Sequence, residues 1–355
     1  QLIEDSANSS INENDTLIIA SVELPLRVIR ADDEANTVET ATPTNLHDNA
    51  DDDDTNNDTK QFIVVKQNSL FMPLLHQLRK RVPLPTKFVG WPGIFPKDDV
   101  EQRAIKKLLE KYDCIPVFPD EKKFQTYLSF CQTYIWPTFH DVLVINEKRQ
   151  NPFTQEQWSC YQAMNYKWGA QIVRHSHESD LIWIHDYHLL LVPQFLMRKI
   201  RRANIGFFLH SPFPSSEIFR SIPVREEILR GMLCADLVGF QFVEYARHFL
   251  VSCKRLLSLE HHFRIGGFLG INLDGRTVCI NSSHVNIHYD DLRKTVEETT
   301  LVGKSAEKIR DEFPDSYIFA SVDRCDRLAG VALKRTRLRI FLRNIPTTRP
   351  KKKKK

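Results

Sequence analysis

The stretch that decides the fold is "SDLIWIHDYHLLLVPQFL", residues 179–196. His185 and Asp186 directly follow its short apolar run, and apolar residues resume directly after His188. A run of this length, rich in β-branched and aromatic residues, is typical of a buried strand. Two histidines and a carboxylate so close together indicate a metal site, a catalytic cluster or the packed end of a strand.

Similar apolar runs recur along the chain, and segments with helical spacing lie between them. The runs predicted as strands are 16–26, 87–95, 113–119, 180–186, 204–214, 235–241 and 316–323. The segments predicted as helices are 99–112, 160–176, 223–233 and 244–259. Strands that are apolar on both faces and alternate with helices predict an α/β fold, in which a Rossmann-like parallel sheet is covered on both sides.

Polar side chains follow two successive predicted strands at the point where each strand ends. His185 and Asp186 follow "LIWI", and His210 follows "IGFFL". Ligands of open parallel sheets bind in the crevice beyond the carboxyl ends of the strands. We therefore expect these three side chains to face one crevice and to form the site.

Metal binding is the disfavoured interpretation of this cluster. His185 and His188 are three positions apart, and such positions on a strand face opposite sides. No third ligand with recognisable spacing follows them. The sequence thus predicts no metal and no cofactor, with His188 packed under the following helix.

Composition restricts the class of protein. The chain has 355 residues, 42% hydrophobic, which suffices for a sizeable core in one or two domains. Its formal net charge of +4 owes much to the terminal "RPKKKKK", so the body indicates neither a nucleic acid nor a membrane partner. A basic nucleic-acid tail over residues 335–355 is the weaker interpretation of that end; a message read into its poly(A) tail is the favoured one.

Cysteine usage and hydropathy point to a cytoplasmic protein. Seven cysteines are scattered without CxxC spacing, which predicts reduced, mostly buried thiols. No apolar run approaches about 18 residues, so no transmembrane helix is predicted.

Four motifs in one order carry a family resemblance: "WIHDYHLLLVPQFL", "IGFFLHSPFPSSEIFR", "PVREEILRGML" and "EYARHFL". Together they resemble the trehalose-6-phosphate synthase family, retaining glycosyltransferases of the two-domain GT-B type, over residues 87–330. The segment "FCQTYIWPTFH" (130–140) is similar to another family motif. Its Cys-Gln is closer to the plant-type, phosphatase-fused members, many of which are regarded as non-catalytic.

The resemblance implies a reaction and a set of residue roles. The family transfers glucose from UDP-glucose to glucose-6-phosphate with retention and without a metal, and the leaving diphosphate is thought to act as the base. Synthase or phosphatase subunits are the protein partners that it allows. The implied catalytic residues are Asp186, on an acceptor hydroxyl, and His210, on the donor glucose. Tyr127 and Trp136 would hold the acceptor and Arg324 the donor diphosphate; core packing is the alternative for both aromatic residues.

The chain also departs from the family pattern. The family's first strand ends in Asn-Arg-Leu-Pro, whose arginine grips the acceptor phosphate, whereas this chain has "VELP" with Glu23 in that place. A carboxylate there replaces attraction to a phosphate by repulsion. No glycine precedes Gly90, so the family's Gly-Gly loop near the donor is missing, and Ala329 stands where catalytic members carry a lysine.

These observations predict a domain organisation and two main hypotheses for function. We expect a disordered tail (1–15), the N-terminal Rossmann-like domain of a GT-B protein (16–315) with an acidic disordered insertion (31–59), and a truncated start of the second domain with a basic tail (316–355). The first hypothesis is a synthase-family protein that is inactive as this polypeptide. The alternative is a non-catalytic relative that binds sugar phosphate or acts as a regulatory subunit.

Overall fold

The computed structural model describes residues 15–31, 62–66, 84–142, 153–200, 204–263, 269–284, 300–314, 318–323 and 330–344, with residues 289, 293 and 296 between them. The chain divides into two compact units, residues 1–289 and 290–355. This division falls earlier in the chain than the boundary after residue 315 that the sequence suggested. The predicted tail (1–15) lies, apart from Asp15, outside the described residues.

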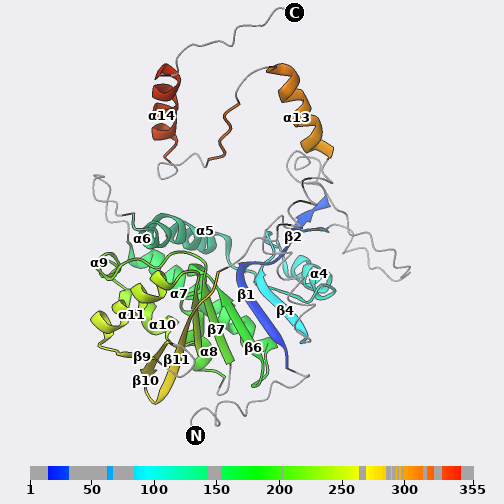
Figure 1. Ribbon diagram of the computed structural model, residues 1–355. Coiled ribbons are helices and arrows are strands. Elements are labelled where there is room, and N and C mark those ends of the chain that lie inside the picture. The colour runs from blue at the N-terminus through cyan, green and yellow to red at the C-terminus, as the bar shows by residue number, and fades with distance from the viewer. Residues whose placement is uncertain are drawn as a thin grey trace, which may run out of the picture. The chain divides into compact units, whose positions relative to one another are not determined.

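The first unit is built on a nine-stranded sheet with the order β5-β4-β1-β6-β7-β8-β11-β10-β9 (Figure 1). Its strands are β1 (Leu17–Glu23), β4 (Thr86–Trp91), β5 (Cys114–Pro116), β6 (Leu181–His185), β7 (Asn204–Leu209), β8 (Leu237–Phe240), β9 (His261–Phe263), β10 (Leu269–Leu273) and β11 (Arg276–Ser282). All pairs from β5 through to β11 are parallel, and only β9 and β10 add antiparallel pairs at one edge. The predicted α/β fold with a mostly parallel sheet is confirmed.

Two strand predictions need correction. The antiparallel edge formed by β9, β10 and β11 was not predicted. The predicted strand at 316–323 is wrong where it can be checked, because residues 318–323 form no strand; residues 316 and 317 lie outside the described residues. Ile318, Phe319 and Val322 are exposed, so this apolar run lacks the burial on two faces that a central parallel strand requires.

A separate two-stranded sheet brackets the acidic tract. β2 (Leu26–Arg30) pairs antiparallel with β3 (Phe62–Lys66), and Arg30 lies opposite Phe62. Arg30 also forms a 3.0 Å ion pair with Glu101. The tract itself, expected over residues 31–59, lies outside the described residues except for Ala31.

All four predicted helices are present. The helices of the first unit are α4 (Asp99–Glu110), α5 (Glu121–Phe130), the π-helical turn η3 (Cys131–Ile135), α6 (Trp136–Phe139), α7 (Gln155–His175), the 3-10 turn η4 (Tyr187–Leu189), α8 (Val192–Met197), α9 (Ser216–Phe219), α10 (Arg225–Met232) and α11 (Val243–Leu257). The second unit contains α13 (Thr300–Glu312) and α14 (Val331–Asn344). α7 begins at Thr154, whose hydroxyl accepts from the Gln157 amide at 3.2 Å, a typical N-cap.

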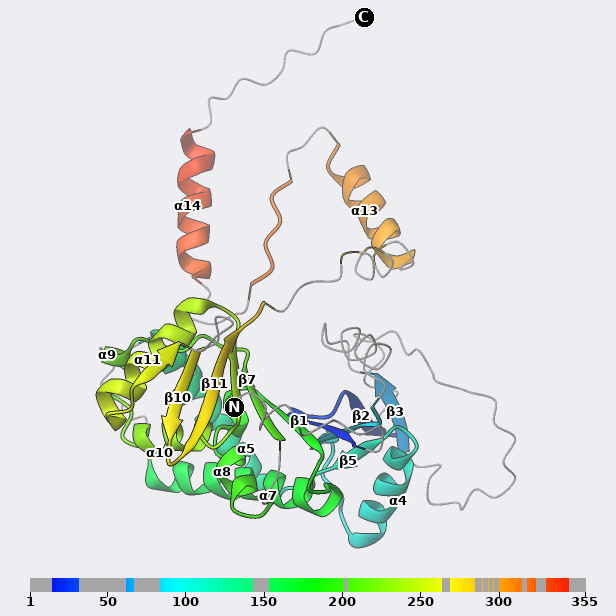
Figure 2. The same cartoon turned by 60° about the horizontal axis from the view of Figure 1, so that its bottom comes forward.

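The two faces of the sheet have separate cores. Ile18 and Ala20 of β1 pack into the larger core, which includes buried side chains of α5, α7, α8, α10 and α11. Leu17 and Ile19 belong to the other core, together with Ile105 and Leu109 of α4. Figure 2 shows α4 apart from α10 and α11. This alternation follows from the two-residue period of a strand. Both faces of β1 are buried, as the sequence predicted for a central parallel strand.

Candidate functional site

The carboxyl ends of β6 and β7 bring the predicted polar residues together. In the parallel register His185 lies opposite Phe208, so Asp186 and His210 follow directly at the same edge. The Asp186 amide donates to the Phe208 carbonyl at 2.8 Å. His185 Nδ1 lies 3.0 Å from His210 Nε2. The three residues lie together as the sequence indicated, but His185 is buried, and the catalytic roles of Asp186 and His210 stay predictions.

Asp186 has a strained backbone, with φ 70° and ψ 170°. This region is populated almost only by glycine and costs about 1–3 kcal/mol for other residues. The structure fixes Asp186 there because its amide and carbonyl bond Phe208 and Leu189, and its Oδ1 accepts from both the amide (3.3 Å) and the hydroxyl (2.9 Å) of Ser211. Such strain gathers at functional sites. Asp186 is therefore the residue of this edge that most strongly indicates function.

His188 adds a second imidazole beside Asp186. Its Nδ1 lies 3.8 Å from Asp186 Oδ2, and its side chain is 16% exposed. Burial lowers the pKa of His188, whereas the carboxylates of Asp186 and Glu23 act to raise it. Glu23, at the end of β1, therefore lies close enough to this cluster for its charge to affect the pKa of His188.

A layer of buried polar side chains supports the turn between β6 and α8. The Tyr161 hydroxyl donates to the Tyr187 carbonyl at 2.7 Å and accepts from the Leu190 amide at 3.1 Å. Asn165 bonds the His188 carbonyl at 3.1 Å and the Leu191 amide at 3.0 Å. The sequence interpretation missed both residues; their signal is two polar groups one turn apart on the otherwise buried side of α7.

Tyr127 belongs to this supporting layer in the structure. Its side chain is fully buried, and its hydroxyl donates to the His188 carbonyl at 3.0 Å. Burial raises the pKa of Tyr127 well above its ordinary value. It lies beneath the segment that carries Asp186, so a contact with the acceptor requires a change of position. Its role as an acceptor ligand stays a prediction.

Trp136 and Arg324 are the remaining predicted binding residues. Trp136 is half-buried at the start of α6, and its ring stacks on His140 with centroids 4.0 Å apart and planes inclined by 28°. His140 Nδ1 also bonds the Trp136 carbonyl at 2.7 Å. Arg324 and Ala329 lie outside the described residues. The binding roles of Trp136 and Arg324 stay predictions.

Glu23 ends β1 at an irregular place in the sheet. The pairing of β1 with β4 shifts register between Ala20 and Glu23, and the exposed Glu23 lies opposite Trp91. A Cβ atom on Gly90 would lie 2.8 Å from the Glu23 carbonyl carbon and the Leu24 amide nitrogen. Gly90 thus lets the backbone after β1 lie close to β4.

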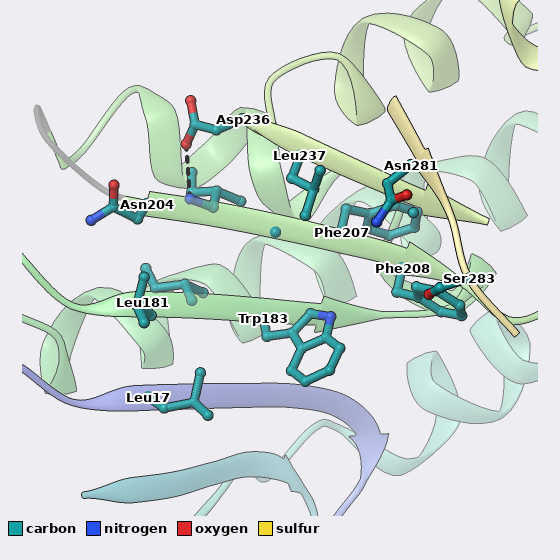
Figure 3. Close-up of a pocket in the computed structure, with 14 residues that line it drawn as sticks. Leu17, Leu181, Trp183, Asn204, Phe207, Phe208, Asp236, Leu237, Asn281 and Ser283 are labelled. Carbon is teal, nitrogen blue, oxygen red and sulfur yellow. Dashed lines mark hydrogen bonds between the residues drawn. The ribbon is translucent and has the colours of Figure 1, made fainter. Parts of the chain in front are cut away.

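A separate pocket lies on one face of the sheet, across β1, β6, β7, β8 and β11 (Figure 3). Its volume is about 390 Å³. Trp183, Phe208 and Leu237 line it, and at one end Asp236 accepts from the Ile205 amide at 2.8 Å. Burial raises the pKa of Asp236. Neither Asp186 nor His210 lines this pocket, so it is distinct from the edge described above.

The described part of the chain lacks two classes of feature. There, no three or more His, Cys, Asp and Glu side chains gather as a metal site would require. No helix among the same residues has the length and apolar character needed to cross a bilayer.

Comparison with known proteins agrees with the fold. The model of glycosyltransferase family 20 matches residues 34–353. The chain belongs to glycosyltransferase family 20. The resemblance seen in the sequence motifs is thereby confirmed.

Relatives within glycosyltransferase family 20 include plant and yeast proteins. Alpha,alpha-trehalose-phosphate synthase (UDP-forming) 5 of Arabidopsis thaliana is 39% identical over 255 residues, 71% of this chain and 29% of the relative. The 56 kDa subunit of the Saccharomyces cerevisiae enzyme of that name is 34% identical over 83% of this chain and 58% of the subunit. The chain thus spans under a third of the plant relative's length and over half of the yeast subunit.

Solved structures share the fold. The N-terminal domain of Candida albicans trehalose-6-phosphate phosphatase superposes with a TM-score of 0.71 at 25% identity, over 94% of this chain and 62% of that one. A Burkholderia xenovorans alpha,alpha-trehalose-phosphate synthase, solved with glucose-6-phosphate, superposes with a TM-score of 0.58 at 18% identity over 84% and 56% of the two chains. Structures of one protein named as a synthase and one named as a phosphatase therefore share the GT-B-like fold of this chain.

Proposed function

We propose that the protein to which this chain belongs transfers the glucosyl group of UDP-glucose to glucose-6-phosphate with retention. The bond between the anomeric carbon and the UDP oxygen breaks, a bond to an acceptor hydroxyl forms, and the hydroxyl proton leaves with UDP. Membership of glycosyltransferase family 20 supports this proposal, as do relatives named UDP-forming synthases. The observation that carries it in this chain is the strained, fixed Asp186 beside His210 at the carboxyl edge.

The geometry suits recognition of sugar hydroxyls. The Oδ1 atom of Asp186 is occupied by Ser211, so its Oδ2 atom is the oxygen placed to accept from an acceptor hydroxyl. Burial lowers the pKa of His210, while Asp186 acts to raise it. A neutral imidazole donates or accepts one hydrogen bond to a donor-sugar hydroxyl. The chain's contribution is then to hold two sugars in reacting orientation, which is worth several kcal/mol of the barrier.

Glucosyl transfer is tested with an Asp186→Asn substitution in the full-length protein. This change keeps the shape and the Ser211 contacts but removes the charge that orients the acceptor. We expect UDP release that depends on both sugars to fall by about 100-fold or more. Asp99→Asn on α4 is the matched control and should leave the rate unchanged. Equal rates for the wild type and Asp186→Asn would contradict the proposal.

The 355-residue polypeptide by itself is expected to release no UDP. This polypeptide spans 29% of the plant relative and 58% of the yeast subunit that carry the synthase name, so part of what those proteins contain lies outside it. Release of UDP that depends on glucose-6-phosphate, from this purified polypeptide, would overturn that expectation.

A non-catalytic, sugar-phosphate-binding or regulatory relative is the second candidate. Glu23 favours it, and so does the match to the N-terminal domain of a protein named as a phosphatase. Such a protein would bind glucose-6-phosphate or UDP-glucose without turnover, even at full length. Calorimetric binding combined with the UDP-release assay separates the two candidates.

A further inference from the structure

The rings of His185 and His210 share a contact that the roles above do not use. His185 Nδ1 lies 3.0 Å from His210 Nε2, and the ring planes are inclined by 33°. His185 is the last residue of β6 and is 4% exposed, whereas His210 is half-buried. The sheet therefore fixes one ring, and that ring touches the other, which lies at the open edge.

A hydrogen bond between two imidazole nitrogens restricts both rings. One nitrogen must carry the proton and the other must offer its lone pair. Protons on both facing nitrogens would repel, and protons on neither would leave no bond. Since a neutral imidazole carries one proton, the tautomer of His185 sets the tautomer of His210.

The surroundings keep this pair neutral. Burial, with His210 beside it, lowers the pKa of His185 to about 3. Burial also lowers the pKa of His210, against the opposite effect of Asp186. The rings that flank the pair are apolar: Trp183 lies 4.8 Å from His185, and Phe208 lies 4.8 Å from His210, between ring centroids. Since both pKa values lie below the ordinary value of histidine, we expect both rings to be neutral near pH 7.

We propose that His185 is a positioning residue that holds His210 in one tautomer and one ring orientation through the Nδ1–Nε2 hydrogen bond. With Nε2 engaged, Nδ1 of His210 has a single role, either as donor or as acceptor. A ligand hydroxyl then either accepts a hydrogen bond from His210 Nδ1 or donates one to it, but cannot do both. The inference concerns the ligand-free chain and does not depend on the proposed glucosyl transfer.

The first test reads the tautomers in the wild-type protein. Long-range ¹H–¹⁵N correlation spectra of ¹⁵N-histidine-labelled protein near pH 7 show which ring nitrogens carry protons. His185→Asn and His210→Asn assign the two sets of signals. We expect a single tautomer for each ring and one proton on the two facing nitrogens. A tautomer mixture at His210, or two protons facing each other, would overturn the proposal.

The second test uses a pair of variants that separate hydrogen bonding from packing. His185→Asn keeps a polar group near the position of Nδ1, and His185→Phe keeps a ring without nitrogen. We expect His210 to keep one tautomer in the Asn variant and to become a mixture in the Phe variant. His175→Phe, which removes an imidazole bonded to Gln171 on α7, is the control and should leave His210 unchanged.

The outcomes are decisive in each case. A His210 ring that keeps its single tautomer in His185→Phe would show that packing alone fixes it and would overturn the proposal. If His185→Phe does not fold, the wild-type spectra still decide. In the full-length protein the Phe variant should also bind UDP-glucose about tenfold more weakly than the Asn variant. Loss of UDP-glucose binding in the wild type would count against the proposed function and leave the tautomer result standing.

Discussion

The carboxyl ends of β6 and β1 lie side by side in the sheet, and they are built in different ways. The two strands pair in parallel with Ala20 opposite Ile184. Beyond β6, Asp186 is held in a strained conformation by Phe208, Leu189 and Ser211. Beyond β1, Glu23 is exposed and follows a shift in register. The carboxylate after β6 is thus held by hydrogen bonds to Ser211, whereas the carboxylate side chain at the end of β1 is exposed.

The family resemblance implies a single site that includes the ends of both β6 and β1, but the two ends differ in how they match the family motifs. At the end of β6 the family motif is kept, and a buried network of Tyr127, Tyr161 and Asn165 depends on it. At the end of β1 the chain departs from the motif, and an exposed carboxylate stands there. The network contacts backbone atoms of residues 187–191, so structural demands account for the path of this segment but not for the strain at Asp186. The end of β1 is therefore the more informative place to ask whether a phosphorylated acceptor binds.

The largest expected effect concerns the contact between α7 and β1. Trp168 on α7 is fully buried, stacks on Phe124 and donates from Nε1 to the Ser21 carbonyl of β1 at 2.9 Å. Trp168→Ala should lower the free energy of unfolding by about 3–5 kcal/mol, because it leaves a cavity. Urea denaturation measures this. Trp168→Phe, which keeps a ring, should lose less, and equal losses would point to the hydrogen bond instead of the cavity.

The next effect is the contribution of His185, at the end of β6, to the pH dependence of the free energy of unfolding. The pKa of His185 is about 3 in the folded chain, below its ordinary value of about 6.5. Protonation therefore favours the unfolded chain, so this contribution is complete above pH 6.5 and is lost as the pH falls toward 3. One such group gives a slope of up to about 1.4 kcal/mol per pH unit.

Urea denaturation at pH 7, 6 and 5 measures that slope. His185→Asn has no group to protonate, so its free energy of unfolding should fall less steeply over this interval than that of the wild type. Parallel curves for the two proteins would show that His185 does not titrate in this way.

How far the sequence predicted these regions depends on the kind of signal. His185, Asp186 and His210 were found because polar residues interrupt apolar runs where two neighbouring strands end. Tyr161 and Asn165 were not found, because their partners are backbone atoms more than twenty residues away that no local pattern marks. The contact between the His185 and His210 rings depends on strand register, which the sequence leaves open.

The missed edge of the sheet had a local signal. Asp274 and Gly275 join β10 to β11, and both have positive φ, 49° and 81°. Asp-Gly between apolar runs is a strong hairpin signal. The predicted strand at 316–323, wrong over the described residues 318–323, failed for the opposite reason: an apolar run by itself does not supply neighbouring strands.

Reversing the charge at the end of β1 tests whether a phosphorylated acceptor binds there. In the full-length protein, Glu23→Arg should raise the affinity for glucose-6-phosphate about tenfold or more, because a cation replaces an anion near the phosphate. The same change should lower the pKa of His188, since the Glu23 carboxylate now acts to raise it. Calorimetry measures the first effect and NMR titration the second. Glu110→Arg on α4 is the control, and equal effects of the two substitutions would show a general charge effect.

The smallest expected effect concerns the tightly held end itself. Ser211→Ala removes the hydroxyl that donates to Asp186 Oδ1 at 2.9 Å, while the Ser211 amide still donates to the same oxygen at 3.3 Å. With one of the two bonds left, the free energy of unfolding should fall by about 1 kcal/mol. Ser221→Ala removes an exposed hydroxyl that donates to the nearby Ile218 carbonyl, and it should cost less. If Ser211→Ala instead abolished folding, the strained conformation of Asp186 would depend on that single hydroxyl and not on the backbone bonds to Phe208 and Leu189.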